Sequence, residues 1–250
     1  MIIKPAIQER LTPKEVRDLV DFLSYHLGYA PKKYPKAVFC KTAKQFAQLY
    51  ETYKIKEPDK IDEINKEVSA FFDHTNDTIV FQGFSYHESV EIPQFVLPMG
   101  VVIHELIHFF QYATGTFGTS RIMYEGTNEI LSAFFVDDFR FDYNKEVLYA
   151  FNLIMELNKH NFWAALQWMR TYTLHSHKNR FVYRAIKQCT TLSRYSPSKL
   201  LRILDADSDA KTGKGDLHEI DNDETRKILT RYKLPRIKTI LKLSREVIKL

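Results

Sequence analysis

The chain has 250 residues, of which 44% are apolar and 14% aromatic, enough to bury one sizeable core and far from the composition of a disordered protein. Its formal net charge is +5, but acidic and basic residues are interspersed from Glu9 to Glu246, so the charge gives no clear nucleic-acid signal. Cys40 and Cys189 match no zinc-finger or disulfide pattern, and no apolar run has the length of a signal peptide or a membrane span. We therefore expect a protein that is cytoplasmic or otherwise soluble and intracellular.

The N-terminal part of the chain predicts a small sheet flanked by helices. Thr12 begins a helix with Pro13 in its first turn, and apolar residues then recur at helical spacing until Gly28. Three further elements are predicted from apolar runs and periodicity: a strand at 36–42, a helix at 43–53 and a strand at 78–82.

The rest of the chain is mainly helical in pattern. Helices are predicted around residue 104 and at about 124–139, 145–157, 162–172, 180–192, 198–204 and 225–250. We therefore expect an α+β, mainly helical protein with a small N-terminal sheet and a helical C-terminal part. The expected organisation is one domain at 1–204 with its core at about 36–139, an acidic loop at 205–223 and a helical tail at 224–250.

The helix around residue 104 carries the sequence HELIH at 104–108. Residues four apart lie on one helix face, so the imidazoles of His104 and His108 project together at the separation that one metal ion requires. Glu105 lies about 100° round the helix, where its carboxylate reaches a metal-activated water and not the metal. Zinc lowers the pKa of its bound water towards about 7, and a carboxylate beside it can transfer the proton to a leaving amine.

The residues around this motif predict a buried helix, since seven of them are apolar: Val101, Val102, Ile103, Leu106, Ile107, Phe109 and Phe110. Buried His and Glu side chains without partners would cost several kcal/mol each, and a dication would satisfy them. A buried hydrogen-bond network is the alternative explanation.

A catalytic zinc usually has a third protein ligand, and Glu125 and Glu129 lie four apart on the next predicted helix. If Glu125 is the ligand, Glu129 lies one turn on and can accept a hydrogen bond from a ligating histidine. If Glu129 is the ligand, the residue one turn on is Ala133. The first arrangement gives both glutamates a role, so we prefer Glu125 and keep Glu129 as the alternative ligand.

HELIH, followed 17 residues after its second histidine by Glu-Gly-x-x-Glu, resembles the gluzincin clan of zinc metallopeptidases, in particular its compact, thermolysin-like, peptidase-MA-like members. The resemblance extends over about 36–139 and implies a zincin-like fold. It also implies one zinc ion per chain, with Glu105 as the general base and with three ligands: His104, His108 and Glu125.

The chain departs from the clan in one respect, because the segment between the two motifs is slightly shorter than in the larger members. A rival register, Asn128-Glu129-Ile130-Leu131-Ser132, resembles a thermolysin segment and would make Glu129 the ligand, but it lacks the acid that follows that segment in thermolysin. The clan also has an edge strand that pairs with an extended substrate, and the strand at 78–82 is expected to be that strand.

The clan usually adds a Tyr or His that hydrogen-bonds the oxyanion, and this chain offers four candidates: Tyr172, His175, His177 and Tyr183. We favour Tyr183. The alternative is that Tyr183 only packs at the edge of the core and has no catalytic role. His175 and His177 are expected in a solvated loop between helices and not as a metal pair.

A partial match to a calcium loop is formed by Asp205, Asp207, Asp209 and Asp216. Its sixth position is Ala210 and not the glycine that the sharp turn requires, so we expect a plain acidic surface loop in preference to a Ca²⁺ site. The tail at 233–250 alternates apolar and basic residues and is expected to pack on its own domain instead of a membrane surface or a partner.

The sequence thus predicts a zinc metallopeptidase that hydrolyses a peptide or protein substrate. An endopeptidase is slightly favoured because no motif for recognising a free amine is evident. The alternative is a non-catalytic structural or binding protein on a zincin scaffold, for instance an assembly component whose zinc joins two helices.

Overall fold

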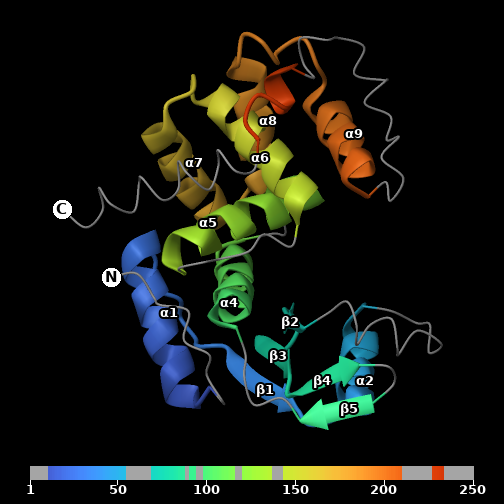
Figure 1. Ribbon diagram of the computed structural model, residues 1–250. Helices are drawn as coiled ribbons and strands as arrows, with labels where there is room; N and C mark the ends of the chain where they lie inside the picture. The colour runs from blue at the N-terminus through green and yellow to red at the C-terminus, as the bar shows by residue number, and fades with distance from the viewer. Residues whose placement is uncertain are drawn as a thin grey trace. The chain divides into compact units, whose positions relative to one another are not determined.

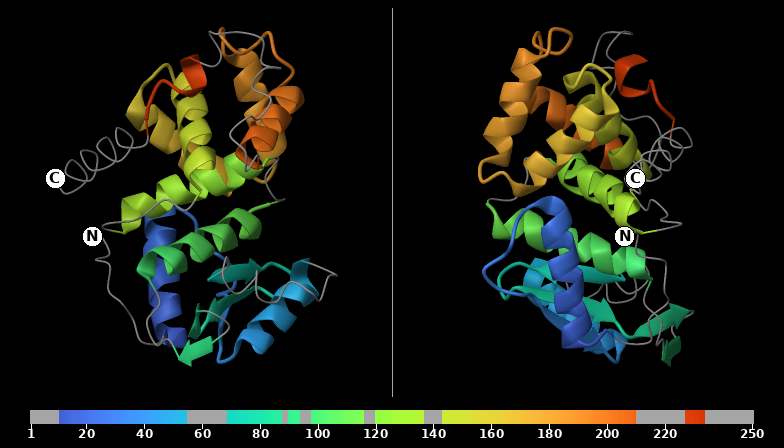
Figure 2. Two further views of the ribbon diagram at one scale, coloured as in Figure 1. Left: turned by 45° about the vertical axis from the view of Figure 1, so that its right-hand side comes forward. Right: turned by 90° about the vertical axis from the view of Figure 1, so that its left-hand side faces the viewer.

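An α+β, mainly helical fold is formed by the described residues (Figures 1 and 2). The computed structural model describes residues 11–54, 69–87, 90–93, 98–115, 120–136, 143–209 and 227–233. Internal contacts divide the chain into two units, one of residues 3–113 and one of residues 114–250 with 1–2. The domain bounds expected from the sequence stay a prediction.

Helix α1 (Pro13–Leu27) begins and ends where the sequence predicts. The Thr12 hydroxyl accepts the backbone N–H of Glu15 at 3.2 Å, and the Glu15 carboxylate accepts the N–H of Thr12 at 2.6 Å, so the two residues cap the helix reciprocally. Gly28 ends the helix in the left-handed conformation with φ 76°, and its N–H donates to the carbonyl of Ser24.

The first unit contains a three-stranded sheet and a separate hairpin. Strand β1 (Lys36–Cys40) runs parallel to β3 (Thr78–Gln82), and β2 (Ala70–Asp73) runs antiparallel to β3, which gives the order β1-β3-β2. Helix α2 (Ala43–Lys54) follows β1 in the chain. Strands β4 (Phe84–His87) and β5 (Val90–Pro93) pair with each other as an antiparallel hairpin.

The prediction that residues 78–82 form an edge strand is wrong, because β3 is the central strand of its sheet. Phe81 is the register partner of Phe39 in β1, and Ile79 is the partner of Phe72 in β2. Four consecutive residues of β3, Thr78 to Phe81, are buried. A continuous buried run of this kind is typical of a strand covered on both faces, which fits the central position of β3 in the sheet.

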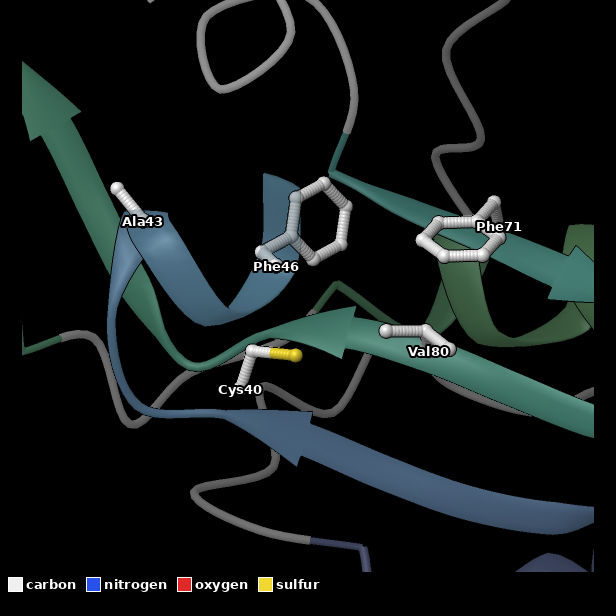
Figure 3. Packing of buried hydrophobic residues seen from close by; sticks show 5 residues of the cluster. All are labelled: Cys40, Ala43, Phe46, Phe71 and Val80. Carbon is white, nitrogen blue, oxygen red and sulfur yellow. The ribbon is translucent and has the colours of Figure 1, made fainter. Parts of the chain in front are cut away.

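Consecutive residues of β2 contact different helices. Phe71 belongs to a buried apolar cluster between the sheet and α2, whose other members are Cys40, Ala43, Phe46 and Val80 (Figure 3). Phe72 points to the opposite face, where its ring packs against Phe109 and Tyr112 of α4 (Met99–Ala113) at centroid distances of 5.8 and 6.0 Å. The sheet therefore lies between α2 and α4.

The second unit is helical. It contains a π-helical turn, η2 (Ile122–Gly126), followed by α5 (Thr127–Phe135), α6 (Asn144–Leu157), α7 (Phe162–Leu174), α8 (Lys178–Gln188) and α9 (Pro197–Asp209). Helix α6 packs against η2, α5, α7 and α9. The helices predicted at 145–157, 162–172, 180–192 and 198–204 are confirmed as α6 to α9, with two differences in extent: α8 ends earlier than expected, and α9 extends through the first residues of the predicted acidic loop. The helix predicted at 124–139 is η2 followed by α5, which ends at Phe135.

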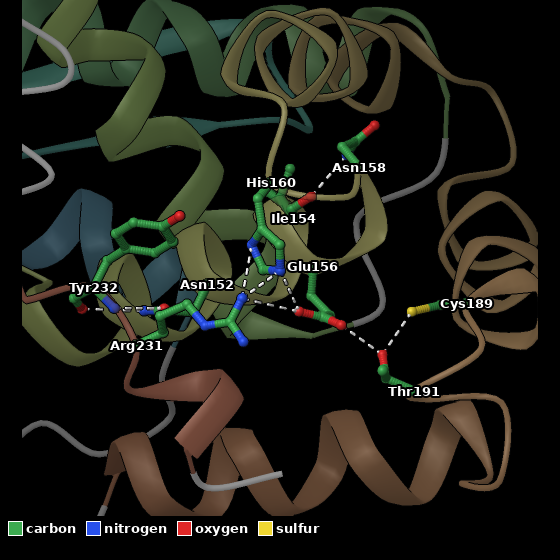
Figure 4. A network of polar contacts seen from close by, with 9 residues as sticks. All are labelled: Asn152, Ile154, Glu156, Asn158, His160, Cys189, Thr191, Arg231 and Tyr232. Atoms are coloured by element: carbon green, nitrogen blue, oxygen red, sulfur yellow. Dashed lines mark hydrogen bonds and ion pairs between the residues drawn. The ribbon is translucent and has the colours of Figure 1, made fainter. Parts of the chain in front are cut away.

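Residues 227–233 are attached to α6 through polar contacts (Figure 4). The Asn152 amide donates to the Tyr232 carbonyl at 3.2 Å and accepts the Tyr232 N–H at 2.9 Å. Beside it, the Glu156 carboxylate lies 3.1 Å from Nε2 of His160 and accepts the Thr191 hydroxyl at 2.6 Å. Most of the predicted tail helix at 225–250 lies outside the described residues.

Within the part of the chain described, no helix combines the length and the apolarity that crossing a bilayer needs.

Candidate metal centre

Helix α4 buries the predicted motif, which confirms that this helix is a buried one. His104 is 8% exposed, Glu105 7% and His108 6%. Eleven of its 15 residues are buried, so α4 does not carry a broad solvated face. Its polar side chains are therefore held away from bulk water.

The two motif histidines turn their Nε2 atoms towards each other. Nε2 of His104 and Nε2 of His108 are 3.0 Å apart, and the rings are nearly perpendicular, with centroids 4.6 Å apart. Two nitrogen ligands of one tetrahedral zinc lie roughly 3.3 Å apart. The spacing of the two nitrogen atoms is thus close to the spacing that one shared ion requires.

Gln111, which the sequence analysis overlooked, orients His108. Oε1 of Gln111 lies 2.8 Å from Nδ1 of His108, and the Gln111 side chain is fully buried. An amide oxygen only accepts, so Nδ1 of His108 carries the proton and donates to it. In this tautomer Nε2 keeps a lone pair that a metal could accept. The signal in the sequence was a polar residue three positions after a ligand on an apolar helix, where the two side chains meet.

Three side chains form a group that can hold a metal ion: His104, His108 and Glu125. Each offers one ligand atom, and these atoms lie within 4.8 Å of one another. Two imidazoles and one carboxylate are a donor set that catalytic zinc takes, and the set leaves a fourth position for water. Glu129 is buried in the first turn of α5 and is not a member of this group.

Glu125 lies in the π-helical turn η2, a type of turn that is rare and often occurs at functional sites. Two side chains cap the free N–H groups of this turn. The Asp205 carboxylate accepts the N–H of Ile122 at 3.0 Å, and the Ser120 hydroxyl accepts the N–H of Met123 at 3.2 Å. These contacts fix the backbone that carries Glu125.

Gly126 lets η2 approach α6 closely. A Cβ at this position would lie 2.6 Å from Cβ of Ala150 and even closer to the carbonyl oxygen of Glu146. The Glu146 side chain also pairs with Arg121, at 3.2 Å between Oε1 and Nε. The glycine of the predicted Glu-Gly-x-x-Glu motif therefore has a packing role next to Glu125.

The expected acidic loop is helical in its first part. Asp205, Asp207 and Asp209 belong to α9, and Asp216 lies outside the described residues. The Asp205 carboxylate caps η2. The possible calcium site stays a prediction.

The four candidates for oxyanion binding all lie in or between α7 and α8. Tyr172 is fully buried and stacked on Trp168, while Tyr183 is half-buried on α8. His175 and His177 lie in the connection between the two helices, as expected, and Nδ1 of His175 accepts the N–H of His177 at 3.0 Å. The role of Tyr183 stays a prediction.

No known protein family matches this sequence, and neither a curated protein nor a solved structure matches it. The functional assignment therefore depends on the two motifs and on the geometry around them.

Proposed function

We propose that this protein is a zinc metallopeptidase, in which His104, His108 and Glu125 hold one zinc ion and Glu105 is the general base. The observation that carries the proposal is the convergence of the two Nε2 atoms, 3.0 Å apart, on a buried helix that also carries Glu105. At 3.0 Å the two nitrogens can share a proton in a hydrogen bond, but the carboxylate of Glu125, which is grouped with them, favours a shared cation.

The donor set favours zinc over calcium or magnesium, because imidazole suits zinc and the hard cations take oxygen ligands. The hydrogen bond from His108 to Gln111 supports the same choice, since ligating histidines commonly donate their second N–H to an acceptor. The group of side chains that could hold a metal ion contains Glu125 and not Glu129, which favours Glu125 as the third ligand.

Glu105 is suited to proton transfer. It lies next to a ligand on the same helix and is 7% exposed. Zinc bound here would supply Lewis acidity, which lowers the pKa of water and polarises a peptide carbonyl. Glu105 then removes a proton from the attacking water and delivers it to the leaving amine. A site that served only to join helices would need no such carboxylate.

The strand at 78–82 is not available to pair with a substrate. Because β3 is central, an extended peptide would pair with β2, which packs against α4 and whose second edge is unpaired within the described residues. The proposed substrate is therefore a peptide or an unfolded protein segment in extended form.

The test combines metal analysis with a cleavage assay on a fluorescently labelled, unfolded protein. We expect about one zinc per chain and cleavage that a chelator abolishes. Glu105→Gln should retain zinc and lose activity by about 10²-fold to 10⁴-fold, because only the proton transfer is removed. His104→Ala should lose both zinc and activity.

Glu156→Gln is the matched control, because Glu156 is buried to a similar degree (9% exposed) and pairs with His160. It should keep zinc and activity if it folds, which its melting curve establishes. A Glu105→Gln protein as active as the parent would refute the assignment of the base. Zinc bound at one equivalent with no cleavage of any protein or peptide library would favour the structural alternative.

A further inference from the structure

The 48 residues at 157–204 contain no aspartate or glutamate. Nine of them are Lys or Arg, whereas 31 acids in 250 residues would place about six acids in a stretch of this length. The stretch thus carries a formal charge of +9, and the remaining 27 basic and 31 acidic residues leave the rest of the chain at −4. The interspersed charge pattern inferred above does not hold here, because α7, α8 and the first half of α9 are purely basic.

Helix α8 has three exposed basic side chains on one side. Arg180, Arg184 and Lys187 are spaced by four and three positions and so lie together. The buried residues of the helix, Lys178, Val182 and Ile186, lie on its inner face. At 100° per residue, the exposed cations lie about 170° from the inner face. These three cations therefore point away from the core of the unit.

Helix α9, which packs against α8, repeats this arrangement. Lys199 and Arg202 are exposed, while the residues that face the core are Leu200, Leu201 and Leu204. Both cations lie on the outer side of α9, about 60° apart round the helix.

The connection between α8 and α9 is basic as well. Nζ of Lys187 donates to the carbonyls of Ser193 and Tyr195 at 3.3 and 3.1 Å, so the end of α8 is joined to this connection. Arg194 is exposed and lies over the ring of Tyr195, 5.1 Å from its centroid. We use the name "basic face" for Arg180, Arg184, Lys187, Arg194, Lys199 and Arg202.

Three of these guanidinium groups have no acidic partner among the described residues: Arg180, Arg184 and Arg202 form no ion pair there. Like charges on two packed helices repel one another, and a bound polyanion would relieve that repulsion.

We propose that the basic face binds the phosphate backbone of a nucleic acid without sequence preference. Four of its six cations are arginines, whose planar guanidinium groups match phosphate geometry. The span from Arg180 to Lys187 is about 10 Å along the helix, which corresponds to roughly three successive phosphates of one strand.

A lipid surface fits this face less well. A helix that lies on a membrane inserts its apolar residues, but Val182 and Ile186 of α8 are buried inside the fold. The large apolar side chains that are exposed among the described residues, Tyr25, Tyr34, Leu49 and Trp163, belong neither to α8 nor to α9.

The test uses fluorescein-labelled 20-nucleotide single strands and 20-base-pair duplexes of unrelated sequences, with fluorescence anisotropy as the readout. A chelator is present throughout, so the outcome does not depend on the proposed zinc site. We expect binding at 50 mM salt with a Kd in the micromolar range, similar for unrelated sequences and at least about tenfold weaker at 200 mM salt.

The variant Arg180→Glu/Arg184→Glu should weaken binding at least about tenfold. Its matched control is Lys32→Glu/Lys33→Glu, which makes the same change in net charge at two exposed lysines of the first unit and should weaken binding less than about threefold. Circular dichroism and melting curves establish that both variants fold. Equal losses in the two variants, no binding at 50 mM salt, binding that salt does not weaken, or binding to anionic vesicles but to neither oligonucleotide would each overturn the proposal.

Discussion

Single side chains decide the geometry of the candidate metal centre, and Gln111 shows this most clearly. The motif predicts two ligands and a base, but the orientation of His108 depends on an amide that the motif does not include. Gln111 lies three residues along α4 from His108, so the two side chains meet on one buried side of the helix.

Replacing Gln111 by Leu should weaken zinc binding by about tenfold to a hundredfold, because His108 loses the acceptor that fixes its tautomer. Competition with a zinc-chelating dye measures the affinity. Gln111→Glu keeps an oxygen acceptor and should stay within a few-fold of the parent. Equal affinities in Gln111→Leu and the parent would show that Gln111 has no such role.

Lys178 is a second residue whose side-chain chemistry depends on its surroundings, in this case through its pKa. Burial lowers the pKa of its ammonium group to about 8, and its Nζ donates to the carbonyl of His175 at 3.1 Å. An unfolded lysine titrates near 10.4, so between about pH 8 and pH 10 the unfolded chain binds more protons than the folded one. The contribution of Lys178 to stability is therefore unfavourable below about pH 8 and improves as the pH rises through that window.

Lys178→Met should raise the free energy of unfolding at pH 7 by about 1 to 2 kcal/mol, after allowance for the lost hydrogen bond to His175. The gain should shrink to near zero or below by about pH 10.5. Urea denaturation at pH 7, 8.5 and 10 measures it, with the exposed Lys199→Met as the control, for which no pH-dependent difference is expected. A difference for Lys178→Met that does not change with pH would contradict the prediction.

At the scale of elements, the turn η2 is positioned by residues from three different segments. Ser120 and Asp205 cap its N–H groups, and Gly126 allows its contact with α6. The sequence predicts a helix in this region, but a π-helical turn depends on packing that residue types alone do not reveal.

Gly126→Ala should destabilise the protein by about 1 to 3 kcal/mol, because the added methyl group meets Ala150 and the carbonyl of Glu146. It should also weaken zinc binding, since Glu125 is the preceding residue. Gly28→Ala is the control: it strains a left-handed helix end with φ 76° and should lower the melting temperature while leaving zinc affinity unchanged. Unchanged zinc affinity in Gly126→Ala would show that the packing of η2 does not affect zinc binding.

Asp205→Ala should cost about 1 kcal/mol of stability by leaving the N–H of Ile122 without its acceptor, whereas Asp205→Asn keeps an oxygen there and should cost less. Denaturant titration compares the two variants. Added calcium should leave the melting temperature of the parent unchanged, since the carboxylate serves as a cap. A calcium-dependent rise that Asp205→Asn abolishes would contradict this interpretation.

At the scale of the whole molecule, the zinc proposal predicts a coupling between metal and stability. Free zinc at about 100 times its Kd should stabilise the folded protein by about 2.7 kcal/mol, or roughly 5 to 10 °C in melting temperature. Calorimetry with and without a chelator measures the shift, and His104→Ala should abolish it. A shift of equal size in His104→Ala would place the zinc elsewhere.

The sequence by itself determined the features that local chemistry specifies. Thr12, Pro13 and Gly28 delimit α1 because capping and backbone freedom act over a few residues, and the spacing of His104 and His108 follows from the helical repeat. Tertiary structure alone decided that β3 is central and not an edge strand, and that Asp205 caps η2. It also decided that Gln111 orients His108, since both side chains had first to be buried on one face of α4. The physical reason is that strand neighbours, long-range caps and burial depend on segments far apart in the chain, whose approach no local pattern encodes.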